Sequence, residues 1–343
     1  MIHGANIFKY QGEGKLTDFS SNINPLGAPK IVYEIIERDL KNIERYPDIE
    51  YRRLYADLSE AFGTEKQNIA IGNGAIELID RIISEHDRII VFDPSFSEYE
   101  IRAKVYGKEF IHFDLKEDFS IDFERLNNFK FKEKDLLIIT NPNNPNGRLL
   151  TADEHKKLID LTNESQVNLM LDEAFIDFVD VNYNSLEFLS DKIYVIRAAT
   201  KFYALPGLRL GILFSSEKNI ERIRELVPSW SVGSLLENIG AIFKDEAFKK
   251  KTREYIKRER EFLLGELAKF KSIKPVKSDA DFILIDLGEN AEEYIFEEFL
   301  KHDILVRKCS SYRNLDGNFI RIAVKSHENN LKLINALEEI LNG

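Results

Sequence analysis

Residues 199–211, A-T-K-F-Y-A-L-P-G-L-R-L-G, place a lysine, Lys201, eight positions before an arginine, Arg209. Twenty-nine positions before that lysine lies Asp172, in the apolar segment L-M-L-D-E-A-F (169–175). An acid at the end of an apolar strand is expensive to bury unless a cation compensates its charge. A lysine nearby can act as a nucleophile, and an arginine can hold a phosphate. The chain therefore carries a nucleophilic amine, an anion-binding group and a buried carboxylate on successive segments.

This combination of groups is what a pyridoxal phosphate site requires. The lysine forms a Schiff base with the cofactor aldehyde, the arginine holds the cofactor phosphate, and the aspartate keeps the pyridine nitrogen protonated. Taken alone, Lys201 would most simply be a solvated lysine, and Asp172 a helix cap or an ion-pair partner. Thr200 before the lysine and P-G-L-R-L-G (206–211) after it favour the cofactor site. We therefore predict pyridoxal 5'-phosphate as the cofactor.

The overall composition limits the classes of function. With 48 Lys and Arg against 59 Asp and Glu, the net charge of −11 argues against a general binder of nucleic acid or of anionic membranes. The single cysteine, Cys309, permits no internal disulfide and no multi-cysteine site, and we predict no metal. We find no signal-peptide pattern and no apolar run near the roughly 20 residues that span a bilayer. These observations predict a cytoplasmic protein without nucleic-acid or membrane partners.

Apolar runs alternate with amphipathic segments along most of the chain. Short apolar runs, typical of strands covered on both faces, occur at 69–75, 88–93, 135–140, 167–172 and 192–197. Helical patterns occur at 30–41, 51–63, 151–164 and within 240–270. This alternation predicts an α/β fold with a mostly parallel central sheet.

The pattern changes after about residue 250 and predicts a second, smaller unit. Its strand-like runs and helical segments are 281–287, 304–309 and 319–324, with 290–302 and 327–341. We expect a large domain over 28–250. We expect a smaller α+β domain built from an N-terminal arm, 1–27, and from 251–343.

Three further loops follow predicted strands, and ligands gather at the carboxyl ends of parallel strands. In G-N-G-A-I-E (72–77), the amides of Ala75 and Ile76 could hold a phosphate at a helix N-terminus. Phe96 could stack on a flat cofactor, and Asn144 of T-N-P-N-N-P-N-G (140–147) could bond a phenolic oxygen. In isolation, each has a simpler explanation: a glycine turn, a core phenylalanine and an Asn/Pro turn.

Together these segments resemble the fold-type I pyridoxal phosphate family, the class I and II aminotransferases, over almost the whole chain. Within it, the chain is most similar to the threonine-phosphate decarboxylase branch of the cobalamin pathway, followed by the histidinol-phosphate aminotransferase branch. The segments that indicate the branch are H-G-A-N (3–6), D-F-S-S-N-I-N-P-L-G (18–27), E-R-Y-P-D (44–48), L-D-E-A-F-I-D-F (171–178), T-K-F-Y-A-L-P-G-L-R-L-G (200–211), P-S-W-S-V (228–232) and I-L-V-R-K-C (304–309).

The resemblance implies a role for each residue that matches the family's cofactor site. Lys201 carries the cofactor, Asp172 pairs with the pyridine nitrogen, Asn144 contacts the phenolic oxygen and Phe96 stacks on the ring. Tyr46 is expected to reach the cofactor phosphate of a second subunit, which implies a homodimer with a shared active site. The residues implied to bind the phosphate within the chain are Gly74, Ala75, Ile76, Thr200 and Arg209.

The resemblance also implies a site for a small phosphorylated amino acid. The positions that match the branch's substrate contacts are His3, Gly4, Asn22, Asn144, Arg307 and Arg321. The two arginines lie fourteen residues apart, and a guanidinium suits both carboxylate and phosphate. Without the resemblance, Arg307 would be an edge-strand surface arginine and His3 part of a disordered terminus.

Three positions depart from the usual aminotransferase pattern. Phe175 occupies the place where many aminotransferases have a tyrosine, and the decarboxylase branch also has phenylalanine. Ala198 replaces a frequent serine or threonine, and Asn146 replaces the usual threonine of N-P-T-G. The change at Phe175 favours the decarboxylase branch, and none of the three abolishes cofactor binding.

The resemblance implies decarboxylation of O-phospho-L-threonine to (R)-1-amino-2-propanol O-phosphate in cobalamin biosynthesis. The same residues could instead carry out transamination of histidinol phosphate, or decarboxylate O-phospho-L-serine to ethanolamine phosphate. The motifs leave open which bond at Cα breaks. A non-catalytic regulator or scaffold is disfavoured, because both Lys201 and Asp172 are present and no DNA-binding domain is added.

Overall fold

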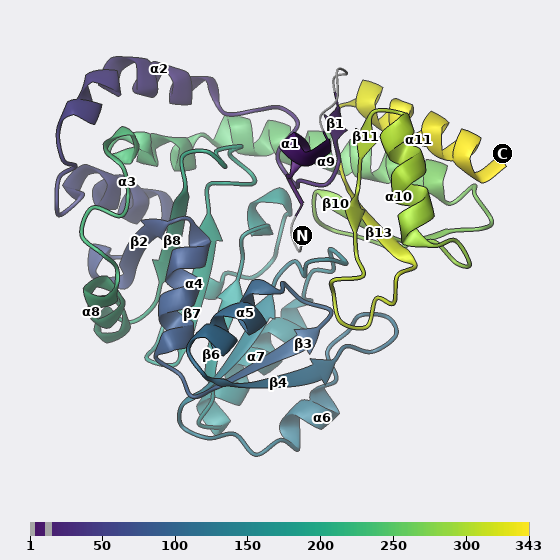
Figure 1. The fold of residues 1–343 in the computed structure, drawn as a ribbon. Coiled ribbons are helices and arrows are strands. Elements are labelled where there is room, and N and C mark those ends of the chain that lie inside the picture. Colours follow the sequence, from purple (N-terminus) through teal and green to yellow (C-terminus); the bar gives the residue numbers. More distant parts are fainter. Residues whose placement is uncertain (1–3, 11–15, 343) are drawn as a thin grey trace.

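The computed structural model describes residues 4–10 and 16–342, and it divides between a large and a small sheet (Figure 1). His3, one of the predicted substrate contacts, lies outside the described residues. The large sheet has seven strands, in the order β2 (Ile69–Asn73), β8 (Leu210–Phe214), β7 (Ile193–Ala198), β6 (Asn168–Asp172), β5 (Asp135–Thr140), β3 (Arg88–Asp93) and β4 (Glu109–Asp114).

All neighbouring pairs from β7 to β4 are parallel, and β8 alone runs antiparallel to both of its neighbours. The predicted α/β fold and mostly parallel sheet are therefore confirmed, and the five predicted strands match β2, β3, β5, β6 and β7 closely. The strands β4 and β8 were not predicted from the sequence. After the loop that contains Lys201 and Arg209, the chain turns back to form β8, so that Ala198 in β7 pairs with Gly211 in β8.

Helices cover both faces of this sheet. The helices are α2 (Lys30–Asp39), α3 (Arg52–Phe62), α4 (Ala75–Ser84), α5 (Glu98–Val105), α6 (Phe123–Asn127), α7 (Ala152–Glu164), α8 (Glu217–Leu226) and α9 (Glu246–Leu267). Apolar side chains of α4, α5 and α8 pack on one face, and those of α3, α7 and α9 belong to the core on the other. Successive strand residues point to opposite faces, so runs such as Ile89–Ile90–Val91 are buried throughout.

The smaller sheet has four antiparallel strands, in the order β12 (Arg307–Lys308), β13 (Phe319–Ala323), β10 (Phe282–Asp286) and β9 (Lys274–Pro275). The helices α10 (Glu292–Lys301) and α11 (His327–Asn342) accompany it, as expected. The predicted strand 304–309 is two short strands, because β11 (Ile304–Leu305) pairs with β1 (Thr17–Asp18) and β12 with β13. The N-terminal arm, with the short α1 (Ile7–Tyr10), thus joins the small unit.

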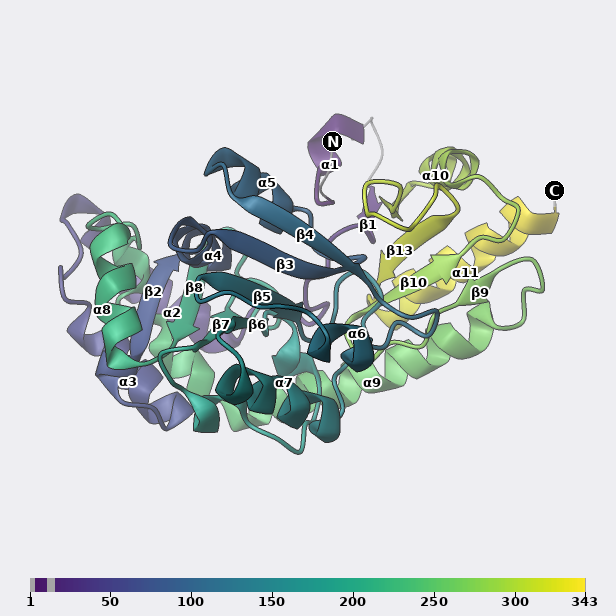
Figure 2. The same ribbon diagram turned by 90° about the horizontal axis from the view of Figure 1, so that it is seen from below.

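The long helix α9 connects the two units and contacts β9, β10 and α11 of the small one (Figure 2). Short 3₁₀ turns complete the chain at Leu40–Glu44, Lys66–Asn68, Ile176–Phe178, Ser185–Phe188, Ser234–Leu236 and Ile239–Lys244. The domain boundaries at 28 and 250 stay a prediction. Over the described ranges, no helix is both long and apolar enough to cross a membrane.

Candidate functional site

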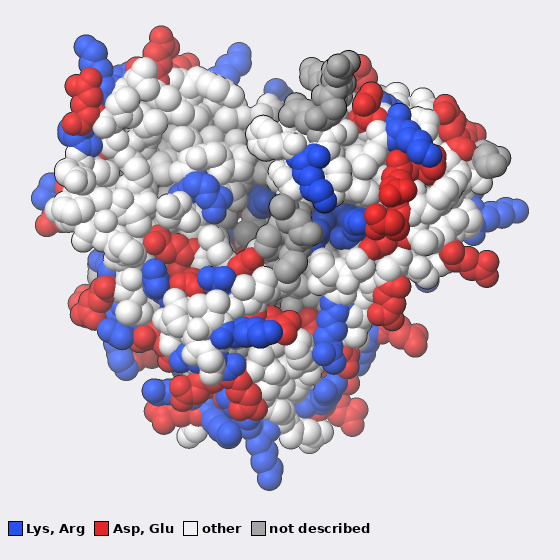
Figure 3. Space-filling model, viewed as in Figure 1, with Lys and Arg blue, Asp and Glu red and all other residues white. Residues whose placement is uncertain are grey.

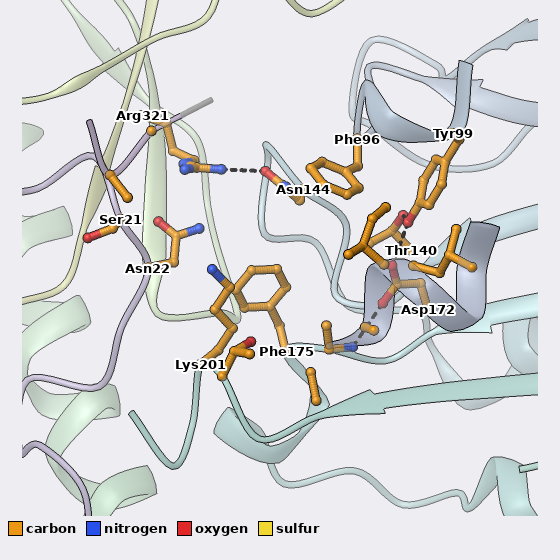
Figure 4. A pocket seen from close by; sticks show the side chains of 18 of the residues that line it. Ser21, Asn22, Phe96, Tyr99, Thr140, Asn144, Asp172, Phe175, Lys201 and Arg321 are labelled. Carbon is orange, nitrogen blue, oxygen red and sulfur yellow. Dashed lines mark hydrogen bonds between the residues drawn. The ribbon is translucent and has the colours of Figure 1, made fainter. Parts of the chain in front are cut away.

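A cavity of about 230 Å³ opens where three neighbouring parallel strands end. Thr140, Asp172 and Ala198 are the last residues of β5, β6 and β7, and all three line it. Side chains of the small unit and of the arm line the opposite side, where Arg321 and Asn22 lie across from Asp172 (Figure 4). The predicted site residues that line this cavity are Gly4, Asn22, Ala75, Ile76, Phe96, Asn144, Asp172, Thr200, Lys201, Arg209 and Arg321.

Asp172 is a buried carboxylate that hydrogen bonds hold in place. The Tyr99 hydroxyl lies 2.7 Å from its Oδ2, and the Ala174 amide donates to its Oδ1 over 3.1 Å. Tyr99 is also 2.9 Å from the Thr140 hydroxyl. Burial raises the pKa of Asp172, and these two donors partly oppose the shift. Among the described residues no cation pairs with this carboxylate, so a protonated ring nitrogen in the cavity would compensate its charge.

Lys201 lies half-buried at the base of the cavity, in the loop between β7 and β8 (Figure 4). Burial lowers its pKa to about 8, and the positive charges of Arg321, Arg209 and Lys325 act in the same direction. A larger fraction of this lysine is therefore a neutral, nucleophilic amine at neutral pH than in a solvated lysine.

The N-terminus of α4 and Arg209 together form an anion-binding cradle. The first amides of the helix, those of Ala75 and Ile76, have no carbonyl to bond within the helix. A Cβ on Gly74, whose φ is 76°, would lie 2.3 Å from a terminal nitrogen of Arg209, so only glycine lets the guanidinium approach. Arg209 itself has a positive φ of 60°. This left-handed conformation is unfavourable for a residue other than glycine and is found most often at functional sites. Gly74 itself does not line the cavity.

Asn144 is oriented by two donors from the small unit. Arg321 donates to its Oδ1 over 2.5 Å and Tyr312 over 3.1 Å. The Arg321 guanidinium also donates to the Ser20 carbonyl oxygen over 3.0 Å. Because both donors meet the carbonyl oxygen of the Asn144 amide, its NH₂ group is left to donate elsewhere. This orientation suits a contact with a phenolic oxygen.

Arg307 and Arg321 are direct neighbours across the β12–β13 pair. They are only 7% and 6% exposed, so two like charges are buried side by side. A guanidinium group at this position is suited to bind a phosphate or a carboxylate. Arg307 does not line the cavity; it donates to the Ser311 hydroxyl over 2.8 Å, and its guanidinium carbon lies 5.6 Å from the centre of the Tyr312 ring.

Two predicted ligand contacts, Tyr46 and Asn22, differ in where the structure places them. Tyr46 does not line its own chain's cavity; its side chain is 75% exposed, with its ring 4.7 Å from that of Trp230. Asn22 is buried in the cavity wall, and its Oδ1 has no partner among the described residues. An acceptor of this kind is available to a donor on a bound ligand.

The three departures from the usual pattern also have places in the structure. Phe175 and Ala198 line the cavity and supply no hydroxyl group there. The Phe175 ring packs edge-on against Phe282, with 5.1 Å between ring centres. Asn146 is fully buried, and its Oδ1 accepts from the Arg148 amide over 2.8 Å. It therefore stabilises its own loop and does not line the cavity.

Sequence reasoning missed several residues of the site. Tyr99 lies three residues after Phe96, and its closeness to that predicted contact was the available signal. Thr140 ends a predicted strand, as Asp172 does. Tyr312 and Ser20 carried no signal, because they meet the cavity only when the small unit and the arm pack against the large sheet.

The aminotransferase class I and II family matches residues 14–337, so the chain belongs to this family. A Caldanaerobacter subterraneus protein provisionally named threonine-phosphate decarboxylase is 39% identical over 98% of this chain and 92% of its own. The threonine-phosphate decarboxylase of Salmonella typhimurium is 32% identical over 99% of this chain and 97% of its own. Histidinol-phosphate aminotransferase from Clostridium acetobutylicum has a crystal structure similar to this one, with a TM-score of 0.89 and 34% identity over 94% of this chain and 98% of its own.

The chain is therefore a pyridoxal phosphate-dependent enzyme, and its cavity fits that cofactor. Asp172 is a buried carboxylate without a cation partner among the described residues, and Lys201 is a lysine with a lowered pKa. The glycine at position 74 leaves room for Arg209 beside the amides of α4. These three features match the ring nitrogen, the aldehyde and the phosphate of the cofactor, respectively.

Proposed function

We propose that this enzyme decarboxylates O-phospho-L-threonine to (R)-1-amino-2-propanol O-phosphate in cobalamin biosynthesis. The observation that carries the substrate class is Arg321, which is buried in the cavity wall with Arg307 opposite it on the neighbouring strand. A phosphorylated amino acid brings a phosphate and a carboxylate, and a guanidinium can bind either group. The decarboxylase names of the relatives at 39% and 32% identity support the reaction type.

When bound, pyridoxal phosphate supplies an electron sink for the bond that breaks at Cα. In this proposal, Asp172 holds a proton on the ring nitrogen, and Tyr99 keeps Asp172 in place. Arg321 holds an anionic group of the substrate and at the same time orients Asn144. The carboxylate carbon leaves as CO₂, and Lys201 delivers the proton that takes its place on Cα.

Transamination of histidinol phosphate is a second candidate on the same residues. The similarity to the Clostridium acetobutylicum enzyme favours it. Lys201 would then remove the Cα proton, and no CO₂ would be released. Decarboxylation of O-phospho-L-serine is a closer variant, because one methyl group in a pocket changes binding by only about 1–3 kcal/mol.

The purified enzyme loaded with pyridoxal phosphate separates these candidates. With O-phospho-L-threonine, we expect release of one CO₂ for each aminopropanol phosphate, without any oxo acid. Formation of a keto product that depends on 2-oxoglutarate, with no CO₂, would refute the proposal. Lys201→Ala should lose both the activity and the near-visible absorbance of the lysine-bound cofactor. The matched control is Lys218→Ala, on the exposed surface of α8.

We also propose that two copies share their active sites through Tyr46. Exposed apolar side chains lie near Tyr46 in sequence, and the exposed Trp230 packs against its ring. The surface around α2 and α3, at the upper left of Figure 3, includes a wide area without charged side chains, which lie along its edge. These exposed apolar side chains are Tyr33, Leu40, Ile43, Tyr46, Ile49 and Trp230. Sedimentation should give a dimer. Tyr46→Ala should weaken cofactor binding, whereas a monomer with full cofactor affinity would contradict the proposal.

A further inference from the structure

Tyr312 lies in the loop between β12 and β13, and it is a buried side chain of the cavity wall, 7% exposed. Its hydroxyl donates to Asn144 Oδ1 over 3.1 Å and accepts from Arg321 Nη1 over 3.3 Å. Because Arg321 Nη1 also donates directly to Asn144 Oδ1, the three side chains close a triangle of hydrogen bonds. A phenol suits this corner, because its oxygen can donate and accept at the same time.

The triangle divides the Arg321 guanidinium into two sides. Nη1 has two hydrogens, and Asn144 and Tyr312 accept both of them. Nη2 donates to the Ser20 carbonyl oxygen over 3.0 Å, so one of its two hydrogens remains. Nε is buried and has no hydrogen-bond partner among the described residues. An anion in the cavity can therefore bind the N–H groups of Nε and Nη2 while the Nη1 side stays engaged.

The small unit holds Tyr312 through both its main chain and its ring. The Tyr312 amide donates to the Cys309 carbonyl oxygen over 2.9 Å. The buried Glu292 of α10 accepts from the amides of Cys309 and Ser310 over 2.7 and 3.0 Å. The Arg307 guanidinium lies over the ring, with its central carbon 5.6 Å from the ring centre. The hydroxyl is therefore held in one place by a supported loop and a packed ring.

We propose that Tyr312 is a positioning residue that acts on the ligand site through Arg321 and Asn144. By occupying the Nη1 side of Arg321, it keeps the Nε side available for the anionic group of the substrate. By donating to Asn144 Oδ1, it keeps that amide in orientation even when a bound anion competes for Arg321. The inference rests on the proposed binding of a phosphorylated amino acid, but not on which bond at Cα breaks.

The substitution Tyr312→Phe tests this role, because it removes the hydroxyl and keeps the ring that packs on Arg307. The first measurement, in the enzyme loaded with pyridoxal phosphate, is the dissociation constant of O-phospho-L-threonine. It is obtained from the rapid absorbance change when the ligand displaces Lys201 from the cofactor. We expect this constant to rise about 5- to 30-fold, because the hydrogen bond that fixes the charged guanidinium is lost.

The second measurement is the pH midpoint of the near-visible absorbance of the lysine-bound cofactor, without substrate. We expect the midpoint of Tyr312→Phe to rise by about half a pH unit or more. The reason is that a less firmly oriented Asn144 stabilises the ionised phenolic oxygen of the cofactor less.

Asp114→Ala is the matched control, because it loosens the same loop and leaves the triangle intact. Asp114 ends β4 with its side chain 53% exposed, and it accepts from Asn314 over 2.8 Å. This variant should keep both wild-type values. A second control adds Tyr312→Phe to Asn144→Ala. Without the Asn144 amide, losing the hydroxyl should not move the pH midpoint any further.

An unchanged dissociation constant or an unchanged midpoint in Tyr312→Phe would overturn the inference. Equal shifts in Asp114→Ala would also overturn it, and so would a further shift of the midpoint in the double variant. A wild-type enzyme that does not bind O-phospho-L-threonine would instead refute the proposed substrate. Histidinol phosphate would then be the probe in the same binding measurement, and the midpoint would test Tyr312 as before.

Discussion

Tyr99, in the first turn of α5, donates a 2.7 Å hydrogen bond to Asp172 at the end of β6. The two residues are 73 positions apart, and both are essentially buried. Burial and the neighbouring carboxylate raise the pKa of Tyr99 well above its usual value, so the phenol stays protonated and remains a donor. The carboxylate that we propose to face the cofactor ring is thereby fixed in orientation by a residue of a different element, the helix α5.

Replacing Tyr99 by phenylalanine should weaken cofactor binding about 10- to 100-fold, because a hydrogen bond to a buried charge contributes ~1.5–3 kcal/mol. The measurement is the dissociation constant of pyridoxal phosphate from its absorbance. Tyr106→Phe is the matched control, since its hydroxyl donates to Asp80 away from the cavity over the same 2.7 Å. An unchanged affinity in Tyr99→Phe would show that Asp172 does not depend on this bond.

Arg321→Lys should raise the KM for the phosphorylated amino acid about 10- to 100-fold, because a lysine cannot make the bidentate contact. Since Arg321 also orients Asn144, kcat should fall as well. The cofactor absorbance should remain, because the Lys201 link is intact. Arg313→Lys, at a half-exposed position in the loop before β13, serves as the control. Equal KM values for the Arg321→Lys variant and the wild type would contradict the assignment of the anion site.

Gly74 and Gly63 give a matched pair for the phosphate cradle. Both have a positive φ, 76° and 61°, but a Cβ would strike Arg209 only at Gly74 and meets open space at Gly63. Gly63→Ala should lose about 1–2 kcal/mol of stability from its left-handed backbone, and Gly74→Ala about 1–3 kcal/mol, because a φ of 76° with a ψ of 162° is a conformation that essentially only glycine adopts. Only Gly74→Ala should also lose cofactor affinity, measured by absorbance. Equal affinity in the two variants would remove Gly74 from the cradle.

The burial of His155 leads us to predict how the free energy of unfolding depends on pH. Its ring is 2% exposed and stacks on Tyr183 with 4.3 Å between centres. Burial lowers its pKa to about 4, against about 6.5 when unfolded. The unfolded chain therefore binds more protons between these values, and stability should fall by ~3 kcal/mol as the pH drops from about 6.5 to about 4.

Urea unfolding across that range should show the slope, and His155→Gln should make it shallower. His86, which is also buried and has a pKa lowered by burial, still contributes in that variant. His302→Gln, with a more exposed ring, should leave it unchanged. A slope that persists in the His155→Gln variant would assign the pH dependence to other groups.

The sequence by itself determined the chemistry and most of the strands that carry it. Lys201, Asp172, Phe96 and Asn144 follow or end apolar runs, and parallel strands bring such positions to one edge. Apolar periodicity reports local burial, which is why the runs that became β3, β5, β6 and β7 were visible.

Only the tertiary structure decided which side chains surround and orient these predicted groups. Arg321 bonds Asn144 across 177 positions, and no local pattern records such a contact. The same holds for the difference between Arg321, which lines the cavity, and Arg307, which does not. The physical reason is that the protonation and orientation of a buried polar group depend on what packs against it. That environment exists only after the small unit and the arm have closed on the large sheet.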